Sequence, residues 1–258
     1  MSYIDEIIYK IFKDEKIISL EEINSDWTNN DNINKTNYYF KLITHKQIYF
    51  IKIKRNLKNE IRFYNILRNI IPIPYFYYYG ALKDNMEYLI EEFVDSVNLY
   101  KINTNDPLYR PLLFSVGEAF GKVFNIKRNK KIECENINLS ILTEHEKSIF
   151  KKYYNEYYLY DGLILFDVAY LCSIYNKIEL KKVSDLENCL YGDIRPYISI
   201  YKQIFGDYFI LGFNSSSKIK YDKLEVFDKE EYFNAQLIKE KVYKQNWLIY
   251  KGDKYEYL

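Results

Sequence analysis

The segment CLYGDIRPYISIY, residues 189–201, followed by DYFILGFN, residues 207–214, decides the fold that the sequence predicts. An apolar lead-in precedes a turn with one carboxylate, Asp193, and two apolar runs follow on either side of Gly206-Asp207. Ile, Tyr and Phe favour strands, and a Gly-Asp pair between two such runs is typical of a turn. The segment therefore predicts a loop carrying Asp193 and then a β-hairpin.

Apolar residues recur at helical spacing in several other parts of the chain. They predict helices over residues 3–13, 57–69, 112–126, 143–180 and 229–244. The second of these ends before Pro72 and Pro74, which stop a helix. The apolar part at 163–174 is too short to span a bilayer and contains Asp167, so we interpret it as buried core.

Alternating polar and apolar residues predict a hairpin near the N-terminus, with strands over 37–44 and 47–54 around the turn at His45-Lys46. The tyrosine-rich run 75–79 and residues 87–94 are also predicted to be strands, and residues 247–258 a terminal hairpin. The same tyrosines could instead stack on nucleic-acid bases, although only composition favours that interpretation. These elements place strands mainly in the first third of the chain.

Composition excludes several classes of protein. The chain has 258 residues, 28% of them charged and 48% hydrophobic, which is ordinary for a globular protein. Because 37 Lys and Arg residues balance 36 Asp and Glu residues, no global charge attracts nucleic acid or an anionic membrane. The three cysteines form no CxxC pair, so neither a disulfide framework nor a zinc site is indicated. We expect a cytoplasmic protein without nucleic-acid or membrane partners.

The segment 189–214 resembles the catalytic segment of the aminoglycoside phosphotransferase and choline kinase family. That family has the signature HGDxxxxN, followed by a strand that ends in Asp-Phe or Asp-Trp. Aligned with it, Asp193 matches the catalytic Asp, while Tyr191, Ile198 and Gly212 fall on the family's His, Asn and metal-binding Asp. The resemblance covers roughly residues 20–225 with the elements in the family's order.

The resemblance implies an α+β, two-lobed protein-kinase-like fold. A small N-terminal antiparallel β lobe with one helix would occupy residues 1–94. A larger, mainly helical lobe with a catalytic-loop β-hairpin and a shortened C-terminus would occupy residues 95–258. The interpretation predicts that the two lobes meet near Asp95.

The resemblance also assigns roles to individual residues in the N-terminal lobe. Lys52 would contact the nucleotide phosphates and pair with Glu60 on the following helix. Solvated lysines on an edge strand would equally explain the alternation of Lys52 and Lys54. The remaining implied nucleotide contacts are the phosphate loop at Thr28 and Asn29 and the inter-lobe hinge at Glu92 and Phe93.

In the C-terminal lobe, Asp193 would be the base that accepts the proton of an attacking hydroxyl. Arg195 beside it would act as a counter-ion, or form a simple surface ion pair. Ile198 and Gly212 offer no ligand to Mg²⁺, which requires oxygen donors. Other side chains that could replace the missing ligands are Asp207, Asn214 and Asp222, although none has the family's spacing.

Two functions follow from this alignment. The missing metal ligands favour a pseudokinase that binds a peptide, a protein or a nucleotide as a regulatory module. The alternative is an active phosphotransferase that uses ATP and Mg²⁺, with Asp193 as base, on a small hydroxylated or amino-alcohol substrate. The sequence leaves the partner, the acceptor and the oligomeric state open.

Overall fold

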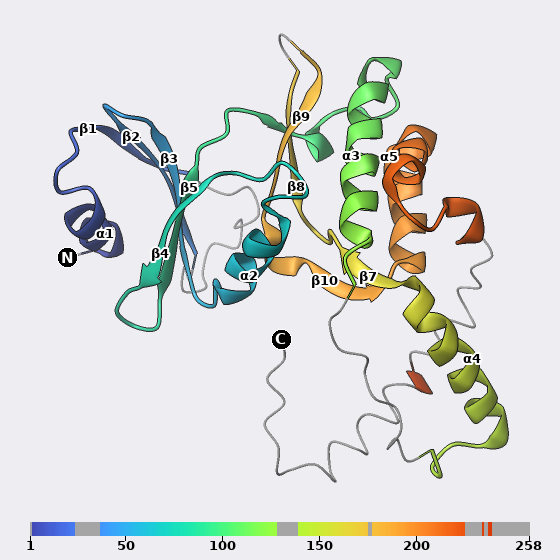
Figure 1. Ribbon diagram of the computed structural model, residues 1–258. Helices are drawn as coiled ribbons and strands as arrows, with labels where there is room; N and C mark the ends of the chain where they lie inside the picture. Colours follow the sequence, from blue (N-terminus) through green and yellow to red (C-terminus); the bar gives the residue numbers. More distant parts are fainter. Residues whose placement is uncertain are drawn as a thin grey trace.

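The structure, a computed structural model, describes residues 2–23, 37–127, 139–174, 177–224, 234 and 237–238, apart from the side chains of 153–159. Its N-terminal part is built on an antiparallel five-stranded sheet with the order β1-β2-β3-β5-β4 (Figure 1). The strands are β1 (Ile17–Glu22), β2 (Tyr38–Thr44), β3 (Ile48–Lys54), β4 (Phe76–Ala81) and β5 (Glu87–Glu92). The predicted 37–54 hairpin and the strands at 75–79 and 87–94 are thus confirmed.

The two faces of this sheet differ in what covers them. Helix α1 (Tyr3–Ile11) packs on one face, where Ile7 joins an apolar cluster with Leu42, Ile51 and Ile90. Side chains two residues apart on a strand point to the same face, so Lys52 and Lys54 lie on the opposite face. Helix α2 (Lys58–Leu67) lies on that side of the sheet (Figure 1).

The rest of the described chain combines three long helices with short strands. The helices are α3 (Arg110–Phe124), α4 (Glu144–Tyr160) and α5 (Arg195–Ser216). One sheet contains β6 (Val97–Asn98), β8 (Ala169–Ser173) and β9 (Glu179–Ser184), and β7 (Asp161–Ile164) pairs with β10 (Leu190–Asp193). Short 3₁₀ turns lie at Leu99–Lys101, Pro107–Tyr109, Leu186–Asn188 and Tyr221–Lys223. This arrangement is the two-lobed α+β architecture that the sequence predicts, and the exact division near Asp95 stays a prediction.

Helices α3 and α5 approach each other closely because glycines stand at their contact. A Cβ added to Gly117 on α3 would lie 1.9 Å from the Phe209 carbonyl oxygen of α5. Conversely, a Cβ added to Gly212 on α5 would lie 1.9 Å from the Phe114 carbonyl oxygen of α3. Both distances are far below van der Waals contact, so only glycine permits this approach.

The predicted hairpin after Asp193 is wrong, because residues 195–216 form helix α5. The Gly206-Asp207 signal has a real local cause, since Gly206 has φ 73° and ψ −164° and interrupts the helix. The residues on both sides are nevertheless helical, and their apolar faces are buried against α3. Packing against α3 has therefore overridden the strand propensity of Ile, Tyr and Phe.

The prediction of one long helix over 143–180 is also corrected. Helix α4 begins after Thr143, whose hydroxyl accepts from the Glu146 backbone N–H, and ends at Tyr160. Strands β7, β8 and β9 follow. The apolar residues at 163–174, in β7, β8 and the loop between them, are largely buried. No helix in the described ranges is long and apolar enough to cross a membrane. The predicted helix at 229–244 and the terminal hairpin lie almost wholly outside the described residues.

Candidate functional site

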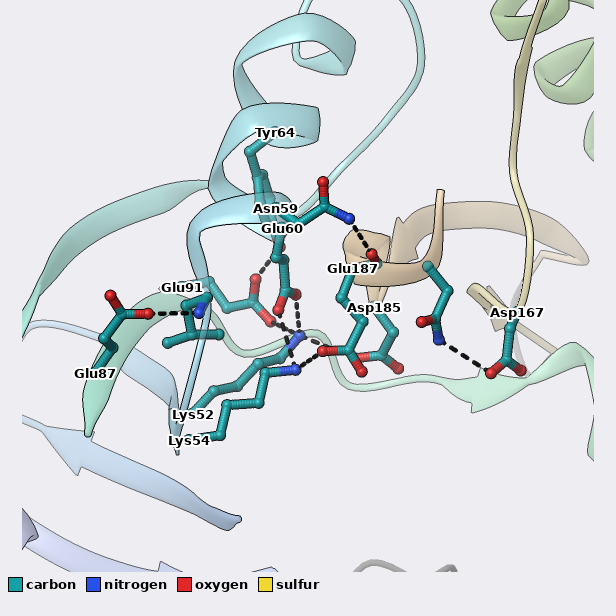
Figure 2. A network of polar contacts seen from close by, with 12 residues as sticks. Lys52, Lys54, Asn59, Glu60, Tyr64, Glu87, Glu91, Asp167, Asp185 and Glu187 are labelled. Carbon is teal, nitrogen blue, oxygen red and sulfur yellow. Dashed lines mark hydrogen bonds and ion pairs between the residues drawn. The ribbon is translucent and has the colours of Figure 1, made fainter. Parts of the chain in front are cut away.

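Lys52, in the middle of β3, is fully buried and surrounded by carboxyl groups from three separate elements (Figure 2). Its Nζ lies 2.7 Å from Glu60 Oε1 of α2, 2.9 Å from Asp185 Oδ1 after β9, and 3.2 Å from Glu91 Oε1 of β5. Because a buried lysine is costly unless its charge is compensated, these contacts depend on one another. They join residues 133 positions apart in the sequence.

Lys54 extends the same arrangement by one step along β3. Its Nζ lies 3.5 Å from Glu60 Oε2 and forms an ion pair with Glu187. Glu60 therefore faces a lysine with each of its carboxylate oxygens. We call Lys52, Lys54, Glu60, Glu91, Asp185 and Glu187 the charged cluster. It contains four carboxyl groups and two ammonium groups, so an additional cation is electrostatically favoured there.

The charges in the cluster shift several pKa values. Burial alone would lower the pKa of Lys52, but Asp185, Glu60 and Glu91 outweigh burial and hold that pKa well above its usual value. The Lys52 ammonium lowers the pKa of Asp185. Burial lowers the pKa of Lys54, despite the nearby Glu60. Lys52 and Asp185 are thus a charged pair at neutral pH.

Asp185 lies at the start of a tight turn between β9 and β10. Its backbone is left-handed, with φ 59° and ψ 49°, a conformation that non-glycine residues adopt at a cost. The next residue, Leu186, is fully buried in the apolar core and anchors the 3₁₀ turn Leu186–Asn188. About half of the Asp185 side chain remains exposed, 51%, so its carboxylate can reach a ligand as well as Lys52.

A second acidic residue, Asp167, lies on the loop 165–168 that connects β7 to β8. It is exposed and also has a positive φ, 49°. Its Oδ2 accepts from Asn188 Nδ2 at 3.1 Å, which links this loop to the Asp185 turn (Figure 2). Helix α5 is bonded to this loop, because the Tyr201 hydroxyl donates to the Leu165 carbonyl at 2.7 Å.

Aromatic rings lie on the sheet face that carries Lys52. Tyr39 and Phe50 are partly exposed, and their rings stack with centroids 6.1 Å apart and planes 5° from parallel. Lys52 Nζ lies 5.6 Å from the centroid of the Phe50 ring. A flat apolar surface beside a fixed ammonium group suits a ligand with both a ring and a negative charge.

Glu91 is almost entirely buried, and burial raises its pKa to about 8, against the opposing effect of Lys52. The folded state then retains this proton between the usual glutamate pKa and pH 8, while the unfolded chain releases it. Stability is therefore lost as pH rises through this interval. We expect Glu91→Gln to stabilise the protein relative to wild type by about 4 kcal/mol more at pH 9 than at pH 5, because three pH units separate pH 5 from the Glu91 pKa of about 8.

Urea denaturation of both proteins across that pH range measures the difference. Glu92→Gln is the matched control, because the neighbouring Glu92 side chain is 36% exposed and pairs with Lys182 at the surface. A Glu91→Gln stability advantage that stayed constant with pH would contradict a proton held on Glu91.

Comparison with solved structures identifies the fold. An APH(2″)-IIIa complex with GDP and kanamycin superposes with a TM-score of 0.54 at 14% identity, covering 97% of this chain and 93% of that one. Spectinomycin phosphotransferase APH(9)-Ia with ADP and spectinomycin gives 0.54 at 13% identity, covering 96% and 89%. The fold is that of the aminoglycoside phosphotransferases.

A third similar structure, the aminoglycoside phosphotransferase APH(4)-Ia with AMP-PNP and hygromycin B, has a TM-score of 0.51 at 11% identity and covers 95% and 97% of the two chains. No protein-family model matches the sequence, and no curated protein matches it. At these identities the likeness establishes the aminoglycoside phosphotransferase fold and nothing finer.

The contacts of the N-terminal lobe bear on some of the residues that the sequence assigned to nucleotide binding. The predicted ion pair between Lys52 and Glu60 forms, and it is buried rather than solvated. Glu92 pairs with Lys182 at 3.2 Å, and the Phe93 ring lies 4.6 Å from Lys41 Nζ. The phosphate loop predicted at Thr28 and Asn29 lies outside the described residues. The nucleotide-binding roles of these positions stay predictions.

The structure places the predicted C-terminal site residues away from the charged cluster. Asp193 is buried at the end of β10, where its backbone lies opposite that of Asp161 in β7. Its Oδ2 accepts from Arg195 Nη2 at 2.6 Å. Leu190, at the opposite end of β10, is the residue that lies near the Asp167 loop. Leu190 and Asp193 are three steps apart along the strand, which is about 10 Å. Arg195 is thus the buried partner of Asp193 and not a surface ion pair.

The alignment of the degenerate positions does not fit the structure either. Ile198 and Gly212 are buried within α5 and face the core, so neither occupies a loop or a strand end. Tyr191 is the neighbour of Gly192 in β10, and its ring lies 6.4 Å from Phe63 of α2. The side chains at these three positions follow from packing within α5 and β10.

The three substitute metal ligands are scattered. Asp207 and Asp222 are exposed, and Asn214 accepts from the Tyr221 backbone N–H. Among the residues that the structure describes, no group of three His, Cys, Asp or Glu side chains is arranged to hold a metal ion. Asp167 and Asp185 are the carboxylates that the sequence prediction missed. The strand-like residues 179–184 could have indicated a turn at Asp185, but the helix predicted over 143–180 overlapped the start of this strand.

Proposed function

We infer that the chain binds a nucleoside triphosphate together with a divalent metal ion at the charged cluster and transfers a phosphoryl group to a small hydroxylated molecule. The observation that supports this most is Lys52, held at once by Glu60 of α2 and by Asp185 after β9. In protein kinases a strand lysine pairs with a helix glutamate, and an aspartate on a turn holds the metal. The same three residue types meet here.

The residues present fit a magnesium ion. Mg²⁺ prefers hard oxygen ligands and is usually held by one or two carboxylates together with substrate phosphates. Asp185 is half exposed and ionised, and it lies in a cluster where carboxyl groups outnumber ammonium groups. Asp185 would therefore hold the metal ion. When bound, such an ion neutralises negative charge on the phosphate oxygens.

The remaining roles follow from the positions of the side chains. Lys52 would orient the phosphates by donating to their oxygens, and Glu60 would keep its ammonium group in place. Asp167, on the neighbouring loop, would accept the proton of the acceptor hydroxyl. That oxygen forms the new bond to the terminal phosphorus, while the bond from this phosphorus to the bridging oxygen breaks and the nucleoside diphosphate leaves. The stacked pair of Tyr39 and Phe50 offers a surface for the nucleobase.

One observation favours a second candidate, a pseudokinase that binds a nucleotide, a peptide or a protein without catalysis. In protein kinases the asparagine that holds the second metal ion follows the catalytic aspartate by five positions, and the residue five positions after Asp167 is Cys172 of β8. Ile198 and Gly212 do not favour the pseudokinase, because both lie inside α5. We therefore place phosphoryl transfer first. A cytoplasmic location stays part of the proposal.

Asp167→Asn tests the catalytic role. We expect the variant to form ADP from ATP and Mg²⁺ at least about 100-fold more slowly than wild type, because a general base contributes a factor of this order. Its affinity for ATP with Mg²⁺ should change less than threefold, because Asp167 does not contact Lys52. Asp207→Asn, an exposed change on α5, is the control and should leave both quantities unaltered.

Steady-state ADP formation and calorimetric binding of AMP-PNP with Mg²⁺ give the two readings. Wild-type protein that binds the nucleotide but forms no ADP, with or without candidate acceptors, would favour the pseudokinase. Equal turnover by wild type and Asp167→Asn would exclude Asp167 as the base.

A further inference from the structure

Glu187 lies two residues after Asp185, on the same turn, and connects this turn to the N-terminal lobe at two points. Its carboxylate pairs with Lys54 of β3, and its backbone carbonyl accepts from Asn59 Nδ2 of α2 at 2.5 Å (Figure 2). Neither contact involves Asp185 itself. The turn is therefore held to both β3 and α2 by groups other than the proposed metal ligand.

The Asp185 turn needs such support. Asp185 adopts a left-handed backbone, which costs a non-glycine residue free energy and persists only when the surroundings impose it. Its own contact with Lys52 is unsuitable as a permanent anchor, because a carboxylate that holds a metal ion shares its oxygens with that ion. Buried Leu186 fixes one side of the turn, and Glu187 fixes the other.

Burial makes the Lys54 contact costlier to break than a surface ion pair. The Lys54 side chain is only 7% exposed, whereas that of Glu187 is 39% exposed. Lys54 cannot regain water easily if Glu187 is removed, and Glu60 Oε2, at 3.5 Å, is already shared with the rest of the cluster. The free energy of the pair therefore favours the present position of the turn.

We propose that Lys54 and Glu187 form a latch that holds the Asp185 turn against β3 and α2, so that Asp185 stays in position when a metal ion replaces part of its contact with Lys52. Both are positioning residues. The use of the turn by a metal ion rests on the proposed function, whereas the latch itself exists in the ligand-free protein.

Amide hydrogen exchange of the ligand-free protein tests the latch independently of any ligand. The Cys189 amide donates to the Leu186 carbonyl at 3.1 Å and reports whether the turn is closed. We expect peptides that contain residues 185–190 to exchange about tenfold faster in Glu187→Gln and in Lys54→Met than in wild type. Glu179→Gln is the matched control, because Glu179 on β9 pairs with Lys177 and Lys181 at the surface, and its exchange should equal that of wild type.

Binding of Mn²⁺ in the presence of AMP-PNP, followed by the electron paramagnetic resonance signal of free Mn²⁺, gives the second reading. Simple electrostatics predicts opposite effects, since Glu187→Gln removes a negative charge and Lys54→Met removes a positive one. The latch predicts that both variants bind Mn²⁺ about five- to tenfold more weakly than wild type. Tighter binding by Lys54→Met would overturn the role of the latch in metal binding.

The two readings separate the latch from the proposed function. Unchanged exchange at 185–190 in Glu187→Gln would overturn the latch, whatever the metal does. Faster exchange in both variants, combined with no Mn²⁺ binding by wild type, would retain the latch and overturn the proposed function. Glu187 is partly exposed, so Glu187→Gln should fold even if Lys54→Met does not.

Discussion

Lys52→Met is expected to lower the free energy of unfolding by about 3 kcal/mol or more at pH 7, because it leaves the buried Glu60 carboxylate, and Asp185 beside it, without their shared cation. The Glu60 side chain is fully buried, and its Oε1 lies 2.7 Å from the Lys52 ammonium. Removing one partner of a buried ion pair costs more than the pair contributes, since the remaining charge cannot return to water. The effect should appear without any ligand.

Urea denaturation measures this loss, and a second substitution shows its cause. Adding Glu60→Gln to Lys52→Met removes one uncompensated charge and should restore at least about 1 kcal/mol. Lys182→Met is the control, because Lys182 is 28% exposed and pairs with Glu92 at the surface, so it should cost less than about 1 kcal/mol. A loss for Lys52→Met no larger than that of Lys182→Met would mean that Lys52 is not held by these carboxylates.

Gly212→Asp is expected to destabilise the protein by about 3 kcal/mol or more and to restore no metal binding. The sequence alignment places a metal-binding aspartate at this position, so the same substitution would repair the site if that alignment were right. In the structure the new Cβ would meet the Phe114 carbonyl oxygen at 1.9 Å, and the helices α3 and α5 would have to separate. Gly212→Ala should be destabilising for the same reason.

Thermal denaturation with and without ATP and Mg²⁺ gives both readings for Gly212→Asp. Leu211→Ala is the matched control on the same helix, because Leu211 is 54% exposed and should cost less than about 1 kcal/mol. A stable Gly212→Asp protein with new metal-dependent nucleotide binding would contradict the helix contact and support the original alignment.

The N-terminal lobe could be predicted from the sequence because its signals are local. The alternation of Lys52 and Lys54 with Ile51 and Ile53 gives the strand, and the helix that follows ends before Pro72. The pairing of Lys52 with Glu60 spans eight residues, and it was predicted from the resemblance to the kinase-like family rather than from the strand and helix patterns alone. The burial of this pair was not predictable, because it depends on Asp185 and Glu91.

The C-terminal lobe could not be predicted in the same way because its packing opposes its local preferences. Residues 195–216 are rich in Ile, Tyr and Phe, yet they form a helix whose apolar side fills the core against α3. Gly192-Asp193 matches the family signature over two residues, which is too little to place it. In the structure, Asp185 after β9 contacts Lys52 of the N-terminal lobe, and Asp167 after β7 contacts Asn188 on the Asp185 turn. Asp193 pairs with Arg195 instead.

Direct measurement of metal-dependent nucleotide binding by wild type and Asp185→Asn tests the central claim, that the charged cluster is a metal and nucleotide site. Isothermal calorimetry with AMP-PNP, with and without Mg²⁺, is suitable because no acceptor is required. We predict binding by wild type that strengthens with Mg²⁺, and a loss of at least about tenfold of this metal dependence in Asp185→Asn, while Asp207→Asn behaves as wild type. Absence of nucleotide binding by wild type, or an unchanged Mg²⁺ dependence in Asp185→Asn, would contradict the claim.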